Sequence, residues 1–353
     1  MTTCSTLLNS PFSDHYELVL IDSTQISNPP PSISIRAMLA LKRFIRFVLA
    51  FFTSKPDAIL LFTAVGASVV EKGAMAWVAR SRRIPVFMFP RGAGLIKTVQ
   101  ASRFQRIWVT TAMRGATHIL CQGPAWQRFA TDVLEFPESR SPIVHNWTAT
   151  ENLLAIGKKR RVVPRSETPT LLFLGWLESE KGIFELLEAS LLLSKKAYSF
   201  RLLIAGRGHA EEEARAFVDS KGLKTYIEFV GWVGDEDKHC LLARTDILIL
   251  PSWAEGFPNA IIEAMAAKLA VIVTTVGNVP DLLSDGQQAI LVPPKDIPSL
   301  ANAIELLLLD QSFRLQLAHR GHVFASETFS VNQGVLKLTS LIDAAIIESH
   351  KRN

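Results

Sequence analysis

The chain has 353 residues, of which 48% are hydrophobic and 20% charged, and its formal net charge is +5. This composition excludes a disordered or fibrous protein, and the length is sufficient for two domains of ordinary size. The three cysteines, Cys4, Cys121 and Cys240, are too few and too scattered for a disulfide framework, so we expect a reducing, cytoplasmic location. No run of the sequence reaches the ~18 apolar residues of a membrane-spanning helix, and the N-terminus lacks the pattern of a signal peptide.

Predicted strands and helices alternate along the first part of the chain. Helices are predicted at 32–52 and 67–81. Short apolar runs predict strands at 16–21, 57–62, 85–89 and 118–121, with a short fifth at 143–145. This alternation is typical of a parallel, doubly wound sheet.

The helix predicted at 32–52 combines basic and apolar side chains. Its sequence includes RAMLALKRFIR at 36–46 and continues into FVLAFF. Such a helix can lie on an anionic membrane surface, as a basic amphipathic segment does. It can equally be a domain helix with one apolar face in the core. Nucleic acid is not an expected partner, because the chain has no basic patch interleaved with aromatic residues.

The loop after the predicted strand at 85–89 reads Pro90-Arg91-Gly92-Ala93-Gly94. Arg91 and Gly92 stand at the carboxyl end of a strand, where an arginine can meet a phosphate or an acidic acceptor. A simple turn is the alternative. His118, at the start of an apolar strand, is interpreted as a structural histidine.

The second half of the chain is more regular than the first. We expect an N-terminal domain at 1–150, a polar linker at 151–168, a second α/β domain at 169–330 and a C-terminal helix at 331–353. Helices are predicted at 298–309, 311–328 and 331–348, besides one that starts near 181. Strands are predicted at 170–174, 200–205, 226–230, 247–250, 270–274 and 289–292.

A strand–loop–helix junction follows the apolar run at 247–250. Its loop contains Glu255 and Gly256, and a helix is predicted to open with Pro258 at its first position. At the carboxyl edge of a parallel sheet such a helix start is suited to a phosphate. Glu263 lies inside this helix among apolar residues, so it should be buried and needs a partner. A ligand hydroxyl pair or an internal cation would serve, and a solvated helix glutamate is the simpler alternative.

The segment EGFPNAIIEAMA, with Glu255 and Glu263 eight positions apart, closely resembles the E-x7-E signature of retaining glycosyltransferases of group 1, or family 4. The resemblance runs over 168–330 and implies the GT-B fold, in which two Rossmann-like domains face each other across a cleft. It implies that Glu255 and the adjoining loop hold the donor sugar and that Glu263 binds the ribose hydroxyls of the nucleotide. The loop residues implied in donor binding are Gly256, Phe257, Pro258 and Asn259.

Other positions follow the family pattern with changes. The family segment G-R-L-x-x-x-K-G occurs as Gly175-Trp176-Leu177-Glu178-Ser179-Glu180-Lys181-Gly182. By resemblance Lys181 binds the donor diphosphate, while Trp176 replaces the second cation and can pack on a sugar or a base. The glycine turn around Arg207 offers another positive charge. Gly277 and Asn278 resemble the family's G-G-I-P-E segment along the sugar and phosphates, with Asn278 tolerated where left-handed dihedrals are needed.

The resemblance fades toward the N-terminus. Family members open with a strand and a glycine-rich loop that have no counterpart here, so the N-terminal domain is predicted to lack its first strand. The D-x-D pattern at 235–237 is interpreted as an acidic helix start and not as a metal site. The resemblance implies no metal and no cofactor.

The function predicted from these features is a retaining glycosyltransferase of the hexosyltransferase type (EC 2.4). It would use a UDP- or GDP-sugar donor and a saccharide or lipid-linked acceptor in polysaccharide biosynthesis. Glu255 and Lys181 are the expected catalytic residues, and Arg91 and Gly92 are expected on the acceptor side. The expected location is cytoplasmic, with peripheral contact to the inner face of the membrane through the helix at 36–52. A non-catalytic relative that acts as a scaffold or partner subunit is the alternative.

Overall fold

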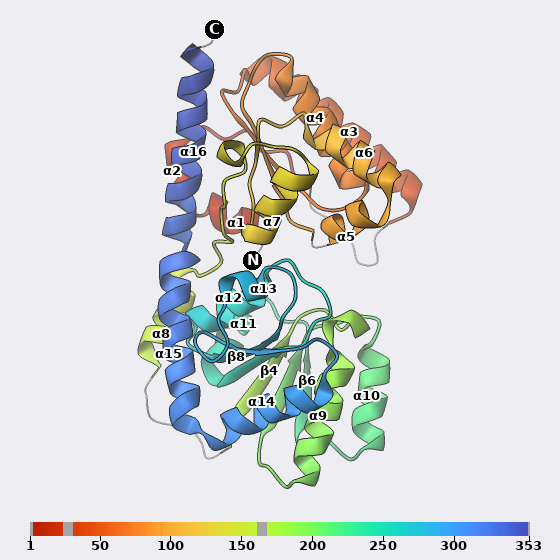
Figure 1. The fold of residues 1–353 in the computed structure, drawn as a ribbon, viewed down its shortest axis with the longest axis vertical. Helices are drawn as coiled ribbons and strands as arrows, with labels where there is room; N and C mark the ends of the chain where they lie inside the picture. The colour runs from red at the N-terminus through yellow and green to blue at the C-terminus, as the bar shows by residue number, and fades with distance from the viewer. Residues whose placement is uncertain (1–2, 24–30, 93, 161–167, 352–353) are drawn as a thin grey trace. The chain divides into compact units, whose positions relative to one another are not determined.

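The computed structural model describes residues 3–23, 31–92, 94–160 and 168–351 (Figure 1). The chain divides into two compact units. Unit 1 contains His145–Gly334 with the N-terminal residues up to Thr6, and unit 2 contains Leu7–Val144 and Val335–Asn353. Each unit has its own parallel sheet and its own hydrophobic core, which confirms the predicted α/β class. Unit 2 gives way to unit 1 after Val144, so the last residues of the expected 1–150 domain belong to unit 1.

Unit 1 is built on a six-stranded parallel sheet with the order β6-β5-β4-β7-β8-β9. Its strands are β4 (Thr170–Leu174), β5 (Arg201–Ala205), β6 (Ile227–Gly231), β7 (Ile247–Leu250), β8 (Ala270–Thr274) and β9 (Ile290–Val292). All six lie within a residue or two of the predicted positions. In β7 and β8 every residue is buried, as expected for central strands that are covered on both faces.

The helices of unit 1 pack on this sheet in two groups. One group contains α9 (Ile183–Lys195), α10 (Glu211–Ser220) and α14 (Ile297–Leu309). The other contains α8 (Glu151–Lys159), α11 (Asp235–Arg244), α12 (Asn259–Ala266) and α15 (Gln311–Thr328). The short elements η3 (Ser179–Lys181) and α13 (Val279–Leu282) lie between strands and helices.

Unit 2 has a three-stranded parallel sheet with the order β1-β2-β3. The strands are β1 (Ile59–Thr63), β2 (Val86–Pro90) and β3 (His118–Ile119). The helices are α1 (Thr3–Leu8), which begins in unit 1, α2 (Phe12–His15), α3 (Ile33–Ser54), α4 (Ala67–Arg80), α5 (Gly94–Ala101), α6 (Arg103–Met113), α7 (Pro124–Arg128), η1 (Phe129–Val133) and η2 (Glu138–Arg140). The last helix, α16 (Val331–Lys351), begins in unit 1 and belongs to unit 2 from Val335 on.

Two predicted strands of the first part are absent from the described structure. The predicted strand Tyr16–Ile21 was wrong: this segment forms no sheet pairing, and the Tyr16 hydroxyl instead donates to the Asp343 carboxylate on α16. A short apolar run therefore occurs here without a neighbouring strand to pair with. The predicted strand at 143–145 is reduced to a single bridge between Ile143 and Cys121.

The linker expected at 151–168 was wrong in its first part, because Glu151–Lys159 forms α8. Thr150 caps this helix by accepting from the Leu153 N–H, and Leu153 is buried in the core of unit 1. Residues 161–167 lie outside the described chain. Helices α5, α6 and α7 were not predicted, whereas α3 and α4 were.

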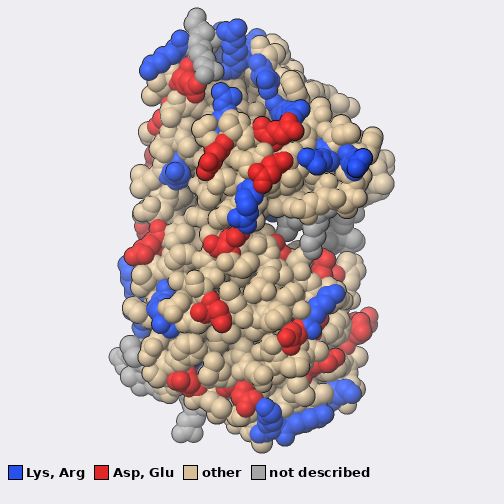
Figure 2. Space-filling view, in the orientation of Figure 1, with Lys and Arg blue, Asp and Glu red and all other residues tan. Residues whose placement is uncertain are grey.

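Charge of both signs is distributed over the visible face of the molecule. Figure 2 shows Lys and Arg side chains interspersed with Asp and Glu side chains, with areas of other residues between them. None of the helices in the described ranges is both long and apolar enough to cross a membrane.

Candidate active site

The strand order of unit 1 defines where a ligand would bind. Strands β4 and β7 are neighbours, and from this pair the sheet runs outward through β5 and β6 on one side and β8 and β9 on the other. This reversal is the topological switch point of a doubly wound sheet, where loops diverge and ligands bind beyond the carboxyl ends of the strands. The loops after β4 and β7 contain most of the predicted site residues.

Lys181 and Glu255 meet at this switch point. Lys181 follows β4 at the end of η3, and its Nζ lies 2.6 Å from Oε1 of Glu255, which follows β7. Ser252 also donates to this oxygen, at 2.9 Å. The two loops approach closely because Gly182 has φ +73°, and a Cβ there would stand 2.1 Å from the Pro251 carbonyl oxygen. The two residues that were expected to be catalytic therefore form one ion pair in the structure.

Glu263 lies inside α12 and is only 6% exposed. Its partner is Lys238 on α11, whose Nζ lies 2.8 Å from Oε1 of Glu263 and 3.6 Å from Oδ1 of Asp235. Burial by itself lowers the pKa of Lys238, but the carboxylates of Glu263 and Asp235 together outweigh burial, so the net pKa is raised. The sequence analysis considered a ligand hydroxyl pair or an internal cation as the partner of Glu263, and in the structure the partner is an internal cation, Lys238.

The start of α12 is oriented by a residue that sequence reasoning assigned to the other domain. Helix α12 begins at Asn259, one position after the predicted start at Pro258, which is instead the N-cap in an extended conformation; α12 has no side-chain cap. Asn146 is buried, and its Nδ2 donates to the Phe257 carbonyl at 3.1 Å and to Oδ1 of Asn259 at 2.9 Å. The backbone N–H groups of the first turn are therefore arranged by Asn146 and not covered by a side chain of α12.

The loop after β8 packs directly on the loop after β7. Gly277 has φ +60°, and a Cβ there would stand 2.0 Å from the Glu255 carbonyl oxygen. The backbone N–H of Asn278 donates to the Gly256 carbonyl at 2.8 Å. Asn278 itself has φ −86°, so the left-handed conformation expected there falls on Gly277 instead. The Oδ1 of Asn278 is buried without a hydrogen-bond partner in the described chain.

Trp176 occupies the loop after β4 next to a second tryptophan. Its ring centroid lies 5.2 Å from that of Trp232, which follows β6, and the rings are 41% and 61% exposed. In the loop after β5, Arg207 is exposed and its carbonyl accepts from the Leu177 N–H. The carbonyl of Gly175 packs against Gly206, in the glycine turn that contains Arg207. Within the described residues no ion pair joins Arg207 to either glutamate.

The residues expected on the acceptor side lie in unit 2, at the carboxyl end of β2. The backbone N–H of Arg91 donates to the Thr63 carbonyl at 2.7 Å, and its guanidinium lies 5.0 Å from the centroid of the Phe89 ring. Burial lowers the pKa of Arg91 to about 10, which leaves it charged at neutral pH. A Cβ on Gly92 would stand 2.5 Å from Val65 Cγ2, so local packing explains this glycine.

The acidic residues of the D-x-D pattern lie at the start of a helix. Asp235 and Asp237 lie in the first turn of α11, as their interpretation as a helix start predicts. Across the described ranges, no group of three or more His, Cys, Asp or Glu side chains could hold a metal ion.

Comparison with known proteins decides the family. Residues 156–323 match the family model described as glycosyl transferases group 1. This segment is a group 1 glycosyl transferase domain. The domain and its flanks are 25% identical over 248 residues to the lipopolysaccharide core biosynthesis glycosyltransferase LpsE of Rhizobium meliloti (strain 1021), which covers 70% of this chain and 68% of that protein. The chain spans between 43% and 68% of the length of the first curated relatives that it matches.

Solved structures share the fold of this chain at low sequence identity. Sucrose-phosphate synthase from Thermosynechococcus elongatus has a TM-score of 0.74 at 20% identity, over 92% of this chain and 82% of that one. Anabaena Alr3699/HepE, solved in complex with UDP-glucose, has a TM-score of 0.69 at 17% identity, over 97% of this chain and 89% of that one. The predicted GT-B fold class is confirmed.

Sequence reasoning missed four residues of this site: Asn146, Lys238, Ser252 and Trp232. Asn146 lies near the end of the predicted 1–150 domain, and its contacts with a loop more than a hundred residues later cannot be deduced from the sequence. The sequence analysis recognised that a buried Glu263 needs a partner such as a cation. A lysine on the preceding helix was the sequence feature that could have pointed to Lys238.

Proposed function

We propose that the chain is a retaining glycosyltransferase that transfers a hexosyl group from a UDP- or GDP-sugar to a saccharide or lipid-linked acceptor in polysaccharide biosynthesis. The observation that carries the proposal is the pair of Lys181 and Glu255 at the switch point, beside a helix start whose N–H groups have no side-chain cap. The bound nucleotide sugar of the structural relative HepE supports the donor class.

Each group has a role that follows from its chemistry. The Lys181 ammonium and the N–H groups at the start of α12 would stabilise the charge that develops on the departing diphosphate. Glu255 would accept hydrogen bonds from the donor sugar, and Glu263 from the ribose hydroxyls, with Lys238 holding the Glu263 carboxylate in place. Arg207 would add positive charge, and Gly277 and Asn278 would keep the backbone of the site compact. We propose that no metal ion or cofactor takes part.

The chemical step balances without a protein nucleophile. The acceptor hydroxyl oxygen forms a bond to the anomeric carbon on the face from which the diphosphate oxygen departs. The hydroxyl proton passes to the departing diphosphate, and the anomeric configuration is retained. The acceptor would bind to unit 2, where Arg91 and Gly92 follow the end of β2.

A second candidate function is a non-catalytic scaffold or partner subunit. Trp176 favours it, because the residue stands where the resemblance implies an arginine on the diphosphate, and one cation binds two phosphates more weakly than two. The scaffold requires no nucleotide sugar, so donor binding separates the two functions.

The test is calorimetric binding of the full chain to UDP-, GDP- and ADP-sugars, together with the release of nucleotide. We expect one base to be preferred and Lys181→Met to weaken that donor about 10- to 100-fold, the effect of losing one charge-assisted hydrogen bond. The matched control is Lys195→Met, a lysine exposed at the end of α9, which should bind as the unaltered chain does. Absence of binding by any donor, or unchanged binding by Lys181→Met, would overturn the proposal.

A further inference from the structure

Trp253 lies in the loop after β7, two positions before Glu255, and is held by three contacts. Its backbone N–H donates to the Glu180 carbonyl at 2.8 Å. Its ring Nε1 donates to Oε1 of Glu185, also at 2.8 Å. The Nζ of Lys295 lies 3.9 Å from the centroid of the ring, which is a cation–π contact. We call Trp253, Glu185 and Lys295 the Trp253 clamp.

The Trp253 clamp joins three segments at the carboxyl edge of the unit 1 sheet. Glu185 lies in the first turn of α9, which follows β4 and η3. Lys295 lies in the loop between β9 and α14. In the strand order, β9 is two strands from β7, which is about 10 Å at the ordinary spacing of a sheet. Trp253 therefore ties the loop that contains Glu255 both to the start of α9 and to the loop after β9.

Folding alone does not explain Glu185. Only one of its carboxylate oxygens bonds Trp253, and the other, Oε2, is buried without a hydrogen-bond partner in the described chain. A buried polar atom without a partner destabilises the folded state. An acid in the first turn of α9 interacts favourably with the helix dipole, but a solvated acid would do so equally well.

The backbone of Lys295 is also costly for folding. Its φ is +63°, in the left-handed region that side chains other than glycine adopt at a cost. The residue is exposed, so packing does not require a lysine there. A glycine would adopt the same backbone without strain but would leave the Trp253 ring without its cation.

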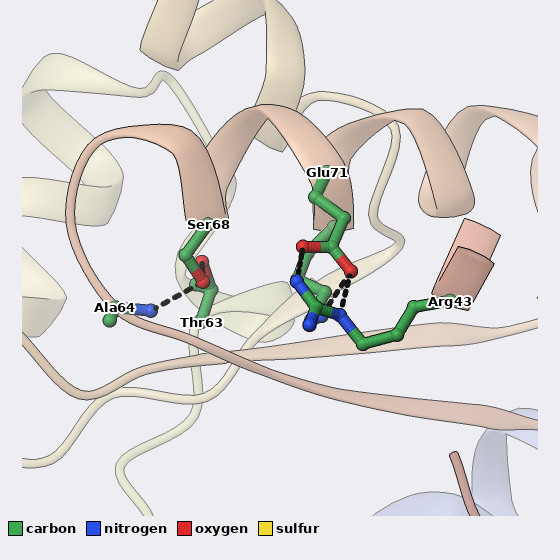
Figure 3. A network of polar contacts seen from close by, with 6 residues as sticks. Arg43, Thr63, Ala64, Ser68 and Glu71 are labelled. Atoms are coloured by element: carbon green, nitrogen blue, oxygen red, sulfur yellow. Dashed lines mark hydrogen bonds and ion pairs between the residues drawn. The ribbon is translucent and has the colours of Figure 1, made fainter. Parts of the chain in front are cut away.

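A charged network in unit 2 shows the contrast (Figure 3). Arg43 of α3 donates two hydrogen bonds of 2.8 Å to the Glu71 carboxylate on α4, and Nζ of Lys72 lies 3.0 Å from the same carboxylate. That network joins two helices of a domain, so helix packing explains it. The Trp253 clamp instead fixes loops, and loops held in place at this edge of a sheet are where binding residues are found.

We propose that Trp253 is a positioning residue that keeps Glu255 and Lys181 in register while a donor is bound. The proposal rests on the proposed function. Glu180, whose carbonyl accepts from Trp253, directly precedes Lys181, so one tryptophan fixes both loops of the ion pair. Nζ of Lys181 lies 2.6 Å from Glu255. A misplacement of about 1 Å at such a site can cost on the order of 100-fold in rate.

The test compares the release of nucleotide from UDP-, GDP- and ADP-glucose with donor affinity measured by calorimetry. Trp253→Phe keeps a ring for Lys295 but loses the Nε1 donor. We expect release at saturating donor to fall at least about 10-fold. The donor Kd should change by no more than about 3-fold, because the contacts of Glu263 with the nucleotide are untouched.

Substitutions of Glu185 test the partner of the ring. Glu185→Leu should lower release as Trp253→Phe does, and the variant with both changes should be no worse than either one. Glu185→Gln keeps an oxygen that accepts from Nε1 and should restore most of the release.

Lys295→Gly separates positioning from stability. Relief of the left-handed strain offsets the lost cation–π contact, so Tm should stay within about 2 °C of the unaltered chain. Release should nevertheless fall about 3-fold, the equivalent of an exposed cation–π contact.

The matched control is Tyr198→Phe, which removes a similar bond at the amino end of β5. The Tyr198 hydroxyl donates to Oε1 of Glu305 at 2.6 Å, and Lys196 pairs with the same carboxylate. This variant should release nucleotide like the unaltered chain. Hydrogen exchange of peptides from 251–258 should quicken in Trp253→Phe and not in Tyr198→Phe.

Unchanged release or unchanged exchange in Trp253→Phe would overturn the proposal, as would Glu185→Gln that is as weak as Glu185→Leu. Absence of release and of donor binding in the unaltered chain would count against the proposed function instead. The exchange comparison would then decide alone whether the Trp253 clamp holds the loop of Glu255.

Discussion

The buried pair of Lys238 and Glu263 gives a prediction whose magnitude follows from the structure. The side chains are 12% and 8% exposed, and removal of one partner from a buried pair costs about 3–5 kcal/mol. Asp235 stays within 3.6 Å of Lys238 and the amide of Glu263→Gln can still accept a hydrogen bond, so we expect about 2 kcal/mol for Glu263→Gln. We expect about 2–3 kcal/mol for Lys238→Met, which leaves a buried carboxylate without its cation.

A double-mutant cycle tests this reasoning. The variant with both changes should be destabilised by less than the sum of the single changes, with a coupling free energy of about 2 kcal/mol. The assay is urea unfolding followed by hydrogen exchange in peptides from α11 and α12, which reports on unit 1 separately. The control cycle uses Lys224 and Asp219, an ion pair of 3.0 Å in unit 1 with side chains 71% and 57% exposed, and its coupling should be close to zero. Additive effects at Lys238 and Glu263 would refute the assignment of Lys238 as the stabilising partner of Glu263.

Three further predictions concern the glycine contact, the tryptophan and the histidine. Gly277→Ala should destabilise unit 1 by more than Gly222→Ala, because both glycines have positive φ but only a Cβ on Gly277 would meet a backbone oxygen, at 2.0 Å. Thermal unfolding compares the two variants, and equal shifts in Tm would contradict this contact. Trp176→Arg should tighten UDP binding by about 10-fold at low salt through an added charge-assisted bond, and calorimetry showing no gain would exclude a diphosphate position there. Burial and Arg140 lower the pKa of His118 to about 4, against 6.5 ordinarily. Between pH 6.5 and pH 4, His118 is protonated in the unfolded chain but stays neutral in the folded chain. Unit 2 should therefore lose up to about 3 kcal/mol of stability as the pH falls from 6.5 to 4. Urea unfolding of His118→Phe should lack this loss.

The sheet of unit 1 could be predicted almost to the residue. Its strands are continuous apolar runs such as Ile247–Leu250, and burial on both faces leaves no ambiguity about their place. Unit 2 was harder to predict, because its sequence contains an apolar run at 16–21 that lacks a partner strand. Helix α8 was not predicted, because the basic run at its end led us to interpret the whole segment as a linker. Thr150, which caps the helix, and Leu153, which is buried, were the features that could have indicated it.

The site was predictable in its residue types and not in its pairings. The spacing of Glu255 and Glu263 identified both carboxylates, and the strand order places Glu255 at the switch point. Which lysine meets which carboxylate depends on how α11 lies against α12 and how the loop after β4 meets the loop after β7. Such contacts join positions 25 to 74 residues apart, and no local pattern encodes them.

The two lysine–glutamate pairs have a consequence for ion selectivity. Lys181 with Glu255, and Lys238 with Glu263, balance to zero net charge. A free phosphate ion that approached either lysine would also meet the negative charge of the paired carboxylate, which offsets much of the attraction. A nucleotide sugar carries phosphate oxygens for the lysine together with several hydroxyl groups that can donate to the glutamates. We therefore expect this edge of unit 1 to discriminate against abundant inorganic anions by requiring both kinds of group in one molecule.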